Sequence, residues 1–181
     1  MLLEKDKSCL LLVDVQEKLA PLVKDAENML SRCQWMIRLA AELQVPLLVS
    51  EQYPKGLGPT IEPLKSLVIN QKRIAKVHFS CFRELTFKHQ LEALERQQLV
   101  LIGIETHVCV LQSAIDLKDA GYDVFVVVDA VSSRFELDHK YGLKRMKQRG
   151  VQLVTSEMVF FEWVEQAGTA EFKALSKAYL M

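Results

Sequence analysis

The chain has 181 residues, half of them apolar and a quarter charged, which is typical of one globular domain with a sizeable core, here residues 1–181. The 23 basic residues balance the 23 acidic ones, so charge gives no reason to expect a nucleic-acid or membrane partner. No apolar run approaches the roughly 20 residues of a membrane span. The first residues are charged where a signal peptide would be apolar, so we expect a cytoplasmic protein.

Short apolar runs alternate with segments of helical periodicity along the chain. Strands are expected at residues 8–15, 45–50, 73–77, 99–102, 123–129 and 151–155. Helices are expected at residues 24–43, 85–97, 106–120, 138–149 and 169–180, and a Gly- and Pro-rich loop at residues 51–63. This alternation predicts a three-layer α/β/α sandwich, with a parallel sheet covered by helices on both faces.

Cys109 occupies a place typical of a reactive thiol. The apolar run Leu99–Ile102 predicts a buried strand that Gly103 ends, and helical spacing begins at Thr106. The cysteine therefore falls in the first turn of a helix, at the carboxyl end of a strand, where open parallel sheets bind their ligands. A helix N-terminus also favours the thiolate form of a cysteine.

Two charged residues, Asp14 and Lys76, also end predicted strands. Asp14 alone could be a helix N-cap or a turn residue, and Lys76 alone could extend its ammonium group to solvent. Taken with Cys109, they make a coherent site: the thiolate attacks a carbonyl, the carboxylate takes and returns the proton, and the ammonium lowers the cysteine pKa. We therefore expect a thiol that reacts near neutral pH.

Other chemistries lack their motifs. No two of the four cysteines have C-x-x-C spacing, so neither a zinc site nor a dithiol is indicated, and all four are expected to be free. Cys9 and Cys33 are expected to be buried, whereas Cys81 is either buried or close to the site. Neither a G-x-G-x-x-G nor a P-loop sequence follows a strand, which argues against dinucleotide and nucleoside triphosphate binding.

Three blocks of sequence, at residues 11–16, 74–82 and 103–110, match a known family in this order. On these blocks the chain resembles the isochorismatase-like cysteine hydrolases over nearly its whole length. The resemblance implies a Rossmann-like six-stranded parallel sheet of order 3-2-1-4-5-6, and an Asp–Lys–Cys triad that falls on Asp14, Lys76 and Cys109. It also implies a cis peptide between Ile104 and Glu105, with the N–H groups of Glu105 and Cys109 as oxyanion donors.

Within that family, residues 50–58 are similar to the isochorismatase-domain-containing branch. Nicotinamidases carry an Asp-x-His metal motif after the second strand, with a further histidine downstream. This chain has Glu51, Gln52 and Tyr53 there, and no histidine before His78. We therefore expect neither a catalytic metal nor a cofactor.

The resulting hypothesis is a metal-independent cysteine hydrolase that acts on a small molecule, at an amide-like C–N bond. Its candidate pocket residues are Gln16, Tyr53, His78, Phe79, Phe82 and His107, of which His107 could equally face solvent. One alternative is a catalytically silent interaction or scaffold protein that keeps the hydrolase fold. Another is a flavodoxin-like binding domain with Asp14 and Asp129 as turn residues, which leaves Lys76 and Cys109 unexplained.

The segment Met158–Val164 is more apolar than a solvated helix requires. Large exposed apolar patches usually mark contacts between proteins, so the segment favours a homo-oligomer, a dimer or larger. The alternative is that this helix packs within its own chain.

Overall fold

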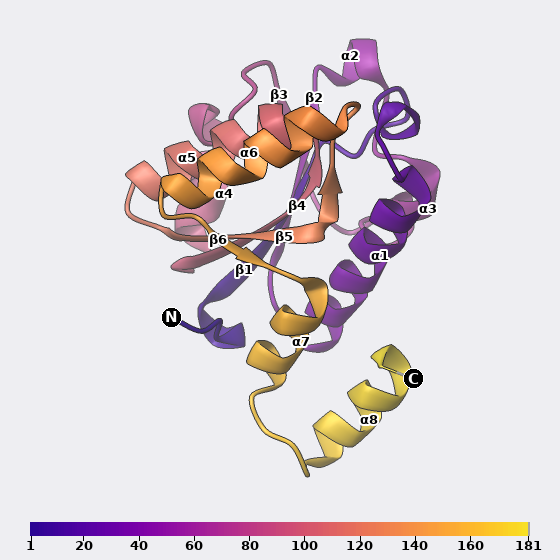
Figure 1. The fold of residues 1–181 in the computed structure, drawn as a ribbon, viewed down its shortest axis with the longest axis vertical. Helices are drawn as coiled ribbons and strands as arrows, with labels where there is room; N and C mark the ends of the chain where they lie inside the picture. The colour runs from indigo at the N-terminus through magenta and orange to yellow at the C-terminus, as the bar shows by residue number, and fades with distance from the viewer. Residues whose placement is uncertain (181) are drawn as a thin grey trace.

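The computed structural model describes residues 1–180, and at its centre lies a six-stranded parallel sheet (Figure 1). The strand order is β3-β2-β1-β4-β5-β6, and every neighbouring pair is parallel. This confirms the expected sheet and its order. The strands are β1 Ser8–Val13, β2 Leu47–Gln52, β3 Arg73–Lys76, β4 Gln98–Ile104, β5 Asp123–Ser132 and β6 Gln152–Val154.

Helices cover both faces of the sheet, which makes the three layers (Figure 1). One face packs against α1 Ala26–Glu42, α7 Ser156–Val164 and α8 Ala170–Tyr179. The other packs against α4 Leu85–Ala93, α5 Leu111–Asp119 and α6 Glu136–Gln148. The central strands β1 and β4 are buried at every position, as expected where helices lie on both sides of a parallel sheet.

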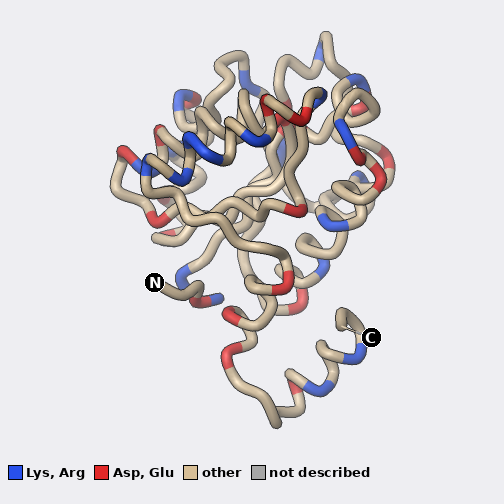
Figure 2. Tube along the Cα trace, viewed as in Figure 1, with Lys and Arg blue, Asp and Glu red and all other residues tan. Residues whose placement is uncertain are grey.

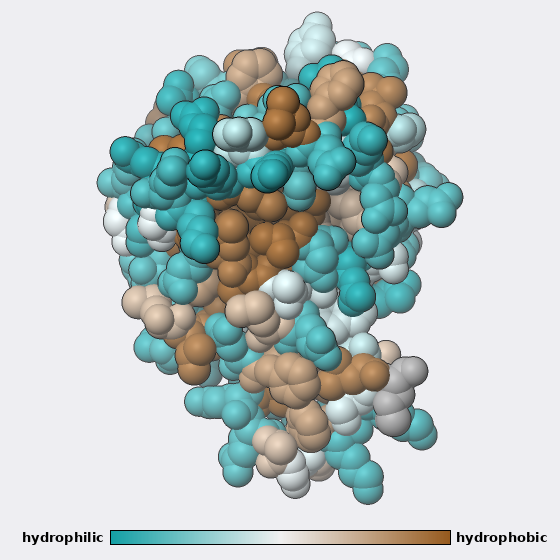
Figure 3. Space-filling view, viewed as in Figure 1, coloured by the Kyte–Doolittle hydropathy of each residue, from teal (hydrophilic) through white to brown (hydrophobic). Residues whose placement is uncertain are grey.

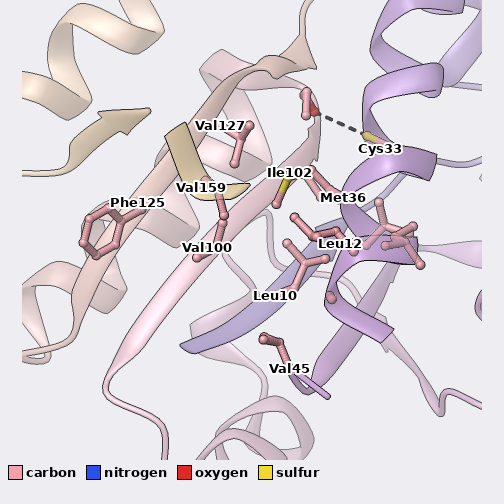
Figure 4. Close-up of a cluster of buried hydrophobic side chains, with 14 of the residues drawn as sticks. Leu10, Leu12, Cys33, Met36, Val45, Val100, Ile102, Phe125, Val127 and Val159 are labelled. Atoms are coloured by element: carbon pink, nitrogen blue, oxygen red, sulfur yellow. Dashed lines mark hydrogen bonds between the residues drawn. The ribbon is translucent and has the colours of Figure 1, made fainter. Parts of the chain in front are cut away.

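Alternate residues of the central strands feed two separate cores. Leu10 and Leu12 point toward the α1 face, where they meet Met36 (Figure 4). Leu11, between them, points to the opposite face and packs with the α4 and α5 side chains, among them Phe87. Both cores together hold β1 and β4 in fixed register, so the residues that follow these strands are rigidly placed.

Several local predictions differ from the structure. The expected helix at residue 106 begins as a π-helical turn, Thr106–Val110, and only then continues as α5. The expected loop at residues 51–63 contains two one-turn helices, α2 Pro54–Leu57 and α3 Glu62–Lys65. The fifth strand does not end at residue 129 but continues to Ser132 along β4.

The apolar segment Met158–Val164 lies entirely in α7, and most of its side chains pack into the core of its own chain. Val159, Phe160, Trp163 and Val164 are buried against the α1 face of the sheet. Only Met158 and Phe161 remain about half exposed. The prediction that this segment forms a large exposed patch is therefore wrong, because its periodicity places the larger apolar side chains inward.

Acidic and basic residues are interspersed along most of the trace in Figure 2, whereas α6 carries several basic residues after its first turn. An apolar hollow lies between α6 and α7, over β5 and β6 (Figure 3). Among residues 1–180, no helix combines the length and apolarity that a membrane span requires.

Candidate active site

The three residues singled out by sequence meet at the carboxyl edge of the sheet. Asp14 directly follows β1, Lys76 is the last residue of β3, and Cys109 lies in the π-helical turn after β4. Because β2 separates β1 from β3, the long Lys76 side chain must reach across the end of β2. The residues at that end of β2 therefore become part of the site.

The backbone at Asp14 adopts the left-handed conformation, with φ of 51°. Non-glycine residues seldom adopt this region, and where they do they often belong to a functional site. Gly103 of the neighbouring β4 makes room for the turn, since a Cβ there would lie only 2.2 Å from the carbonyl oxygen of Val13. Its own φ of 114° also requires glycine.

Asp14 and Lys76 form an ion pair that is completely buried. Lys76 Nζ lies 2.7 Å from Asp14 Oδ2, and neither side chain has any exposed surface. Asp14 Oδ1 accepts a hydrogen bond of 2.7 Å from Ser50 Oγ on β2. Burial acts to lower the pKa of Lys76, but the Asp14 carboxylate and the neighbouring Cys81 and Cys109 together outweigh it, so the pKa is raised and the lysine is an ammonium ion.

The Lys76 ammonium has three protons and four acceptors. Three of the acceptors are neutral oxygens: Gln52 Oε1, the carbonyl of His78 at 3.2 Å and the carbonyl of Phe79 at 2.9 Å. The fourth is Asp14 Oδ2, 2.7 Å from Nζ. No other N–H or O–H group in residues 1–180 donates to this oxygen, so one of its lone pairs remains free for a proton.

Cys109 lies next to this pair and is protonated at rest. Burial raises the pKa of its thiol, and the charge and side-chain hydrogen bonding of Asp14 raise it further. The Lys76 charge lowers the pKa of this thiol, but by less than burial and Asp14 raise it. The expectation that the helix N-terminus and the Lys76 ammonium lower the pKa of Cys109 is therefore wrong, because desolvation and the adjacent carboxylate dominate. The thiolate must be made by a proton transfer during the reaction.

The other cysteines are fully buried free thiols with raised pKa values. Burial raises the pKa of Cys9 to about 12, and it raises that of Cys33 as well. For Cys81, burial and Asp14 raise the pKa to about 11. The influence of Asp14 and Lys76 places Cys81 beside the site, and Cys109 differs from all three in having some exposed surface, 6%.

The segment between β4 and Cys109 turns sharply. The peptide bond joining Ile104 and Glu105 is cis, at the position that the family resemblance implies. The Glu105 carboxylate accepts hydrogen bonds from the backbone N–H and the side chain of Arg134, at 3.1 and 2.9 Å. The Glu105 carbonyl accepts from the N–H of Val108 and of Val110, the second bond being of the π-helical kind.

Of the predicted pocket residues, three contact Lys76, two of them through its ammonium group. Tyr53 is 55% exposed, and its N–H donates to the carbonyl of Lys76. His78 and Phe79 give their carbonyls to the ammonium, while the His78 ring binds Glu84 at 2.9 Å. The Phe79 side chain is half exposed.

The other three have different surroundings. Gln16 is fully buried, and its amide bonds the backbone of Gln52 and Gly58, so it braces the loop instead of facing a pocket. Phe82 packs edge-on against Tyr122, which precedes β5 at the opposite edge of the sheet. These two assignments are therefore wrong. The His107 ring is partly exposed and bonds Ser133 Oγ at 2.9 Å.

The position that holds a metal motif in nicotinamidases is committed to other contacts here. Glu51 Oε1 accepts from the N–H and the hydroxyl of Thr60, at 2.8 and 2.7 Å, and Gln52 accepts from Lys76. Across residues 1–180, no three His, Cys, Asp or Glu side chains are arranged to hold a metal ion.

Sequence reasoning missed Ser50 and Gln52, which bind the ion pair from β2. Both are buried polar residues at the carboxyl end of a strand, on the same side of its pleat. That position was the available signal, because a polar side chain at the end of a buried parallel strand requires a buried partner.

The amino-acid sequence matches a known family over residues 8–158, by the model of the isochorismatase domain. The chain belongs to the isochorismatase family. It is 37% identical over 170 residues to isochorismatase domain-containing protein 2 of Xenopus laevis, covering 94% of this chain and 82% of that one. It is 39% identical over 176 residues to isochorismatase domain-containing protein 2A of Mus musculus, covering 95% and 82%.

Solved structures of similar proteins share the fold closely. A protein described as MAR1 ribonuclease from Caenorhabditis elegans has a TM-score of 0.93 and 37% identity, over 100% of this chain and 93% of that one. The YcaC product of Escherichia coli, described as an octameric hydrolase of unknown specificity, has a TM-score of 0.91 and 27% identity, over 99% and 91%. The family therefore identifies this chain as an isochorismatase-like hydrolase.

Proposed function

We propose that this hydrolase uses Cys109 as its nucleophile and cleaves an amide-like C–N bond of a small molecule, without a metal. Support comes from one observation above all: the buried Asp14 Oδ2 contacts the Lys76 ammonium and keeps a lone pair free beside a protonated thiol. A carboxylate whose ammonium partner is shared with three neutral oxygens is suited to act as a general base.

The reaction begins when the Cys109 thiol gives its proton to Asp14 and Sγ attacks the carbonyl carbon. The N–H groups of Glu105 and Cys109 stabilise the resulting oxyanion. Asp14 then gives the proton to the leaving nitrogen, and the C–N bond breaks to leave a thioester. Water adds to the thioester while Asp14 takes one of its protons, and the proton returns to Sγ as the carbon–sulfur bond breaks.

Lys76 keeps its proton throughout in this mechanism. Its pKa is raised above 10.5, and its protons are held by Gln52 and two carbonyls, so it is a poor proton donor. It supplies a fixed positive charge that stabilises the thiolate when Asp14 becomes neutral. Once Asp14 is neutral, this charge offsets the cost of keeping the thiolate buried. The resting pKa of Cys109 does not include this effect, because Asp14 is then still charged.

A panel assay tests the proposal. Small amides, related esters and a short RNA oligonucleotide are incubated with the wild type and with Cys109→Ala, and products are detected by mass spectrometry. The RNA is included because one structural neighbour is described as a ribonuclease. We expect turnover of at least one amide or ester that Cys109→Ala abolishes. Turnover that survives this substitution would contradict the proposal. Absence of turnover for every compound in the panel would favour a scaffold role.

A further inference from the structure

Gln52 contacts the ion pair at a point that determines where the lysine protons go. Its side chain is buried, and its two amide groups have separate partners: Oε1 accepts from Lys76 Nζ, and Nε2 donates to the carbonyl of Val77 at 2.9 Å. The second bond fixes the orientation of the amide, because a flipped amide would place two acceptors against each other. Gln52 therefore presents an oxygen, and only an oxygen, to the ammonium.

Four oxygens surround three ammonium protons. Gln52 Oε1 and the carbonyls of His78 and Phe79 share these protons with Asp14 Oδ2, which lies 2.7 Å from Nζ. If any of the three neutral acceptors were removed, the released N–H would strengthen the hydrogen bond to the carboxylate. A carboxylate that accepts a stronger charged hydrogen bond is a weaker base.

We infer that Gln52 is a positioning residue, which competes with Asp14 for the Lys76 protons and so keeps Asp14 basic enough to take the thiol proton. This inference rests on the proposed function and deepens it. The backbone carbonyls of His78 and Phe79 cannot be changed by substitution, so Gln52 is the one side chain of the three acceptors that mutation can remove. Gln52 itself touches no reacting atom.

The backbone around Gln52 is held independently of its side chain. Its N–H and carbonyl both bond the amide of Gln16, and β2 pairs Gln52 with Lys76 in register. Replacing Gln52 by Met, which has a similar length, therefore removes the amide while the strand end keeps its bonds. A matched control is Thr60→Val, which removes a buried hydrogen bond to the adjacent Glu51 without touching the ion pair.

The test is the rate at which iodoacetamide alkylates Cys109 between pH 5.5 and 9, followed by peptide mapping. When the thiol proton passes to an internal base, the thiolate fraction does not depend on pH, so the wild type should show a flat rate over this range. Gln52→Met should lower this plateau roughly tenfold, the effect of one unit of lost basicity. Thr60→Val should keep the wild-type plateau despite a lower melting temperature.

Gln52→Asn gives a second measure, because it keeps a buried amide that is one methylene too short to reach Nζ. It should lower the plateau as Gln52→Met does, and it replaces that variant if Met prevents folding. A plateau unchanged in the folded Gln52 variants would show that the residue is merely structural. A wild-type rate that rises with pH throughout would instead overturn the proposed function itself, so the two failures are distinguishable.

Discussion

Replacing Lys76 with methionine should destabilise the protein severely, because it leaves the Asp14 carboxylate buried and unpaired. Neither side chain of the pair has any exposed surface. The substitution removes the ammonium, and with it the contact to Asp14 and three hydrogen bonds to neutral oxygens. Removing one partner of a buried ion pair costs about 3–5 kcal/mol. For a chain of this size, each kcal/mol corresponds to roughly 2–4 °C in Tm, so the melting temperature should fall by about 6–20 °C.

The assay is urea and thermal unfolding followed by circular dichroism at pH 7. The double variant Asp14→Asn/Lys76→Met separates an unpaired charge from lost packing, because it removes both charges at nearly constant volume. It should be more stable than Lys76→Met alone by about 2 kcal/mol or more, which is the size of coupling expected for contacting residues. A loss below about 1 kcal/mol in Lys76→Met, or no recovery in the double variant, would refute the reasoning about this pair.

Three further predictions follow from other features. The pKa of Lys76 is raised in the folded state, so its stabilising effect is full below about pH 10.4 and is lost as pH rises above its folded pKa. In urea unfolding, the difference in unfolding free energy between the wild type and Lys76→Met should therefore be smaller at pH 11.5 than at pH 9, and an equal difference at both pH values would oppose this prediction. Gly103→Ala should lower the free energy of unfolding by more than about 2 kcal/mol, because its Cβ would overlap the Val13 carbonyl at 2.2 Å. A free energy of unfolding equal to that of the wild type would contradict the close approach of β4 to Val13. We propose a homo-oligomer, a dimer or larger, since the apolar hollow over β5 and β6 is open (Figure 3). Light scattering at micromolar concentration should return a mass of at least twice 20.7 kDa, and a mass of 20.7 kDa would contradict the proposal.

The fold was largely predictable because its signals are strong and local. Buried parallel strands appear as short apolar runs, and the alternation with helices leaves few topologies. Positions at strand ends, such as Asp14 and Lys76, follow directly once the strands are placed. The strand order came from the family resemblance and not from the residues themselves.

Other features were not predictable because they depend on tertiary surroundings. The resting state of Cys109 depends on the balance of desolvation against two opposite charges, which no local pattern shows. The π-helical turn at Thr106–Val110 has no sequence signature beyond helical periodicity. Gln16 and Phe82 were assigned to a pocket from their position in the chain, but hydrogen bonding and packing direct them elsewhere.

The pH dependence of Cys109 alkylation in the wild type and in Asp14→Asn tests the central claim most directly, namely that Asp14 takes the thiol proton. With Asp14 present, the rate should be flat between pH 5.5 and 9. With Asn in its place, the thiol can lose its proton only to solvent, so the rate should rise about tenfold per pH unit. A wild-type rate that rises in the same way as that of Asp14→Asn would contradict the account.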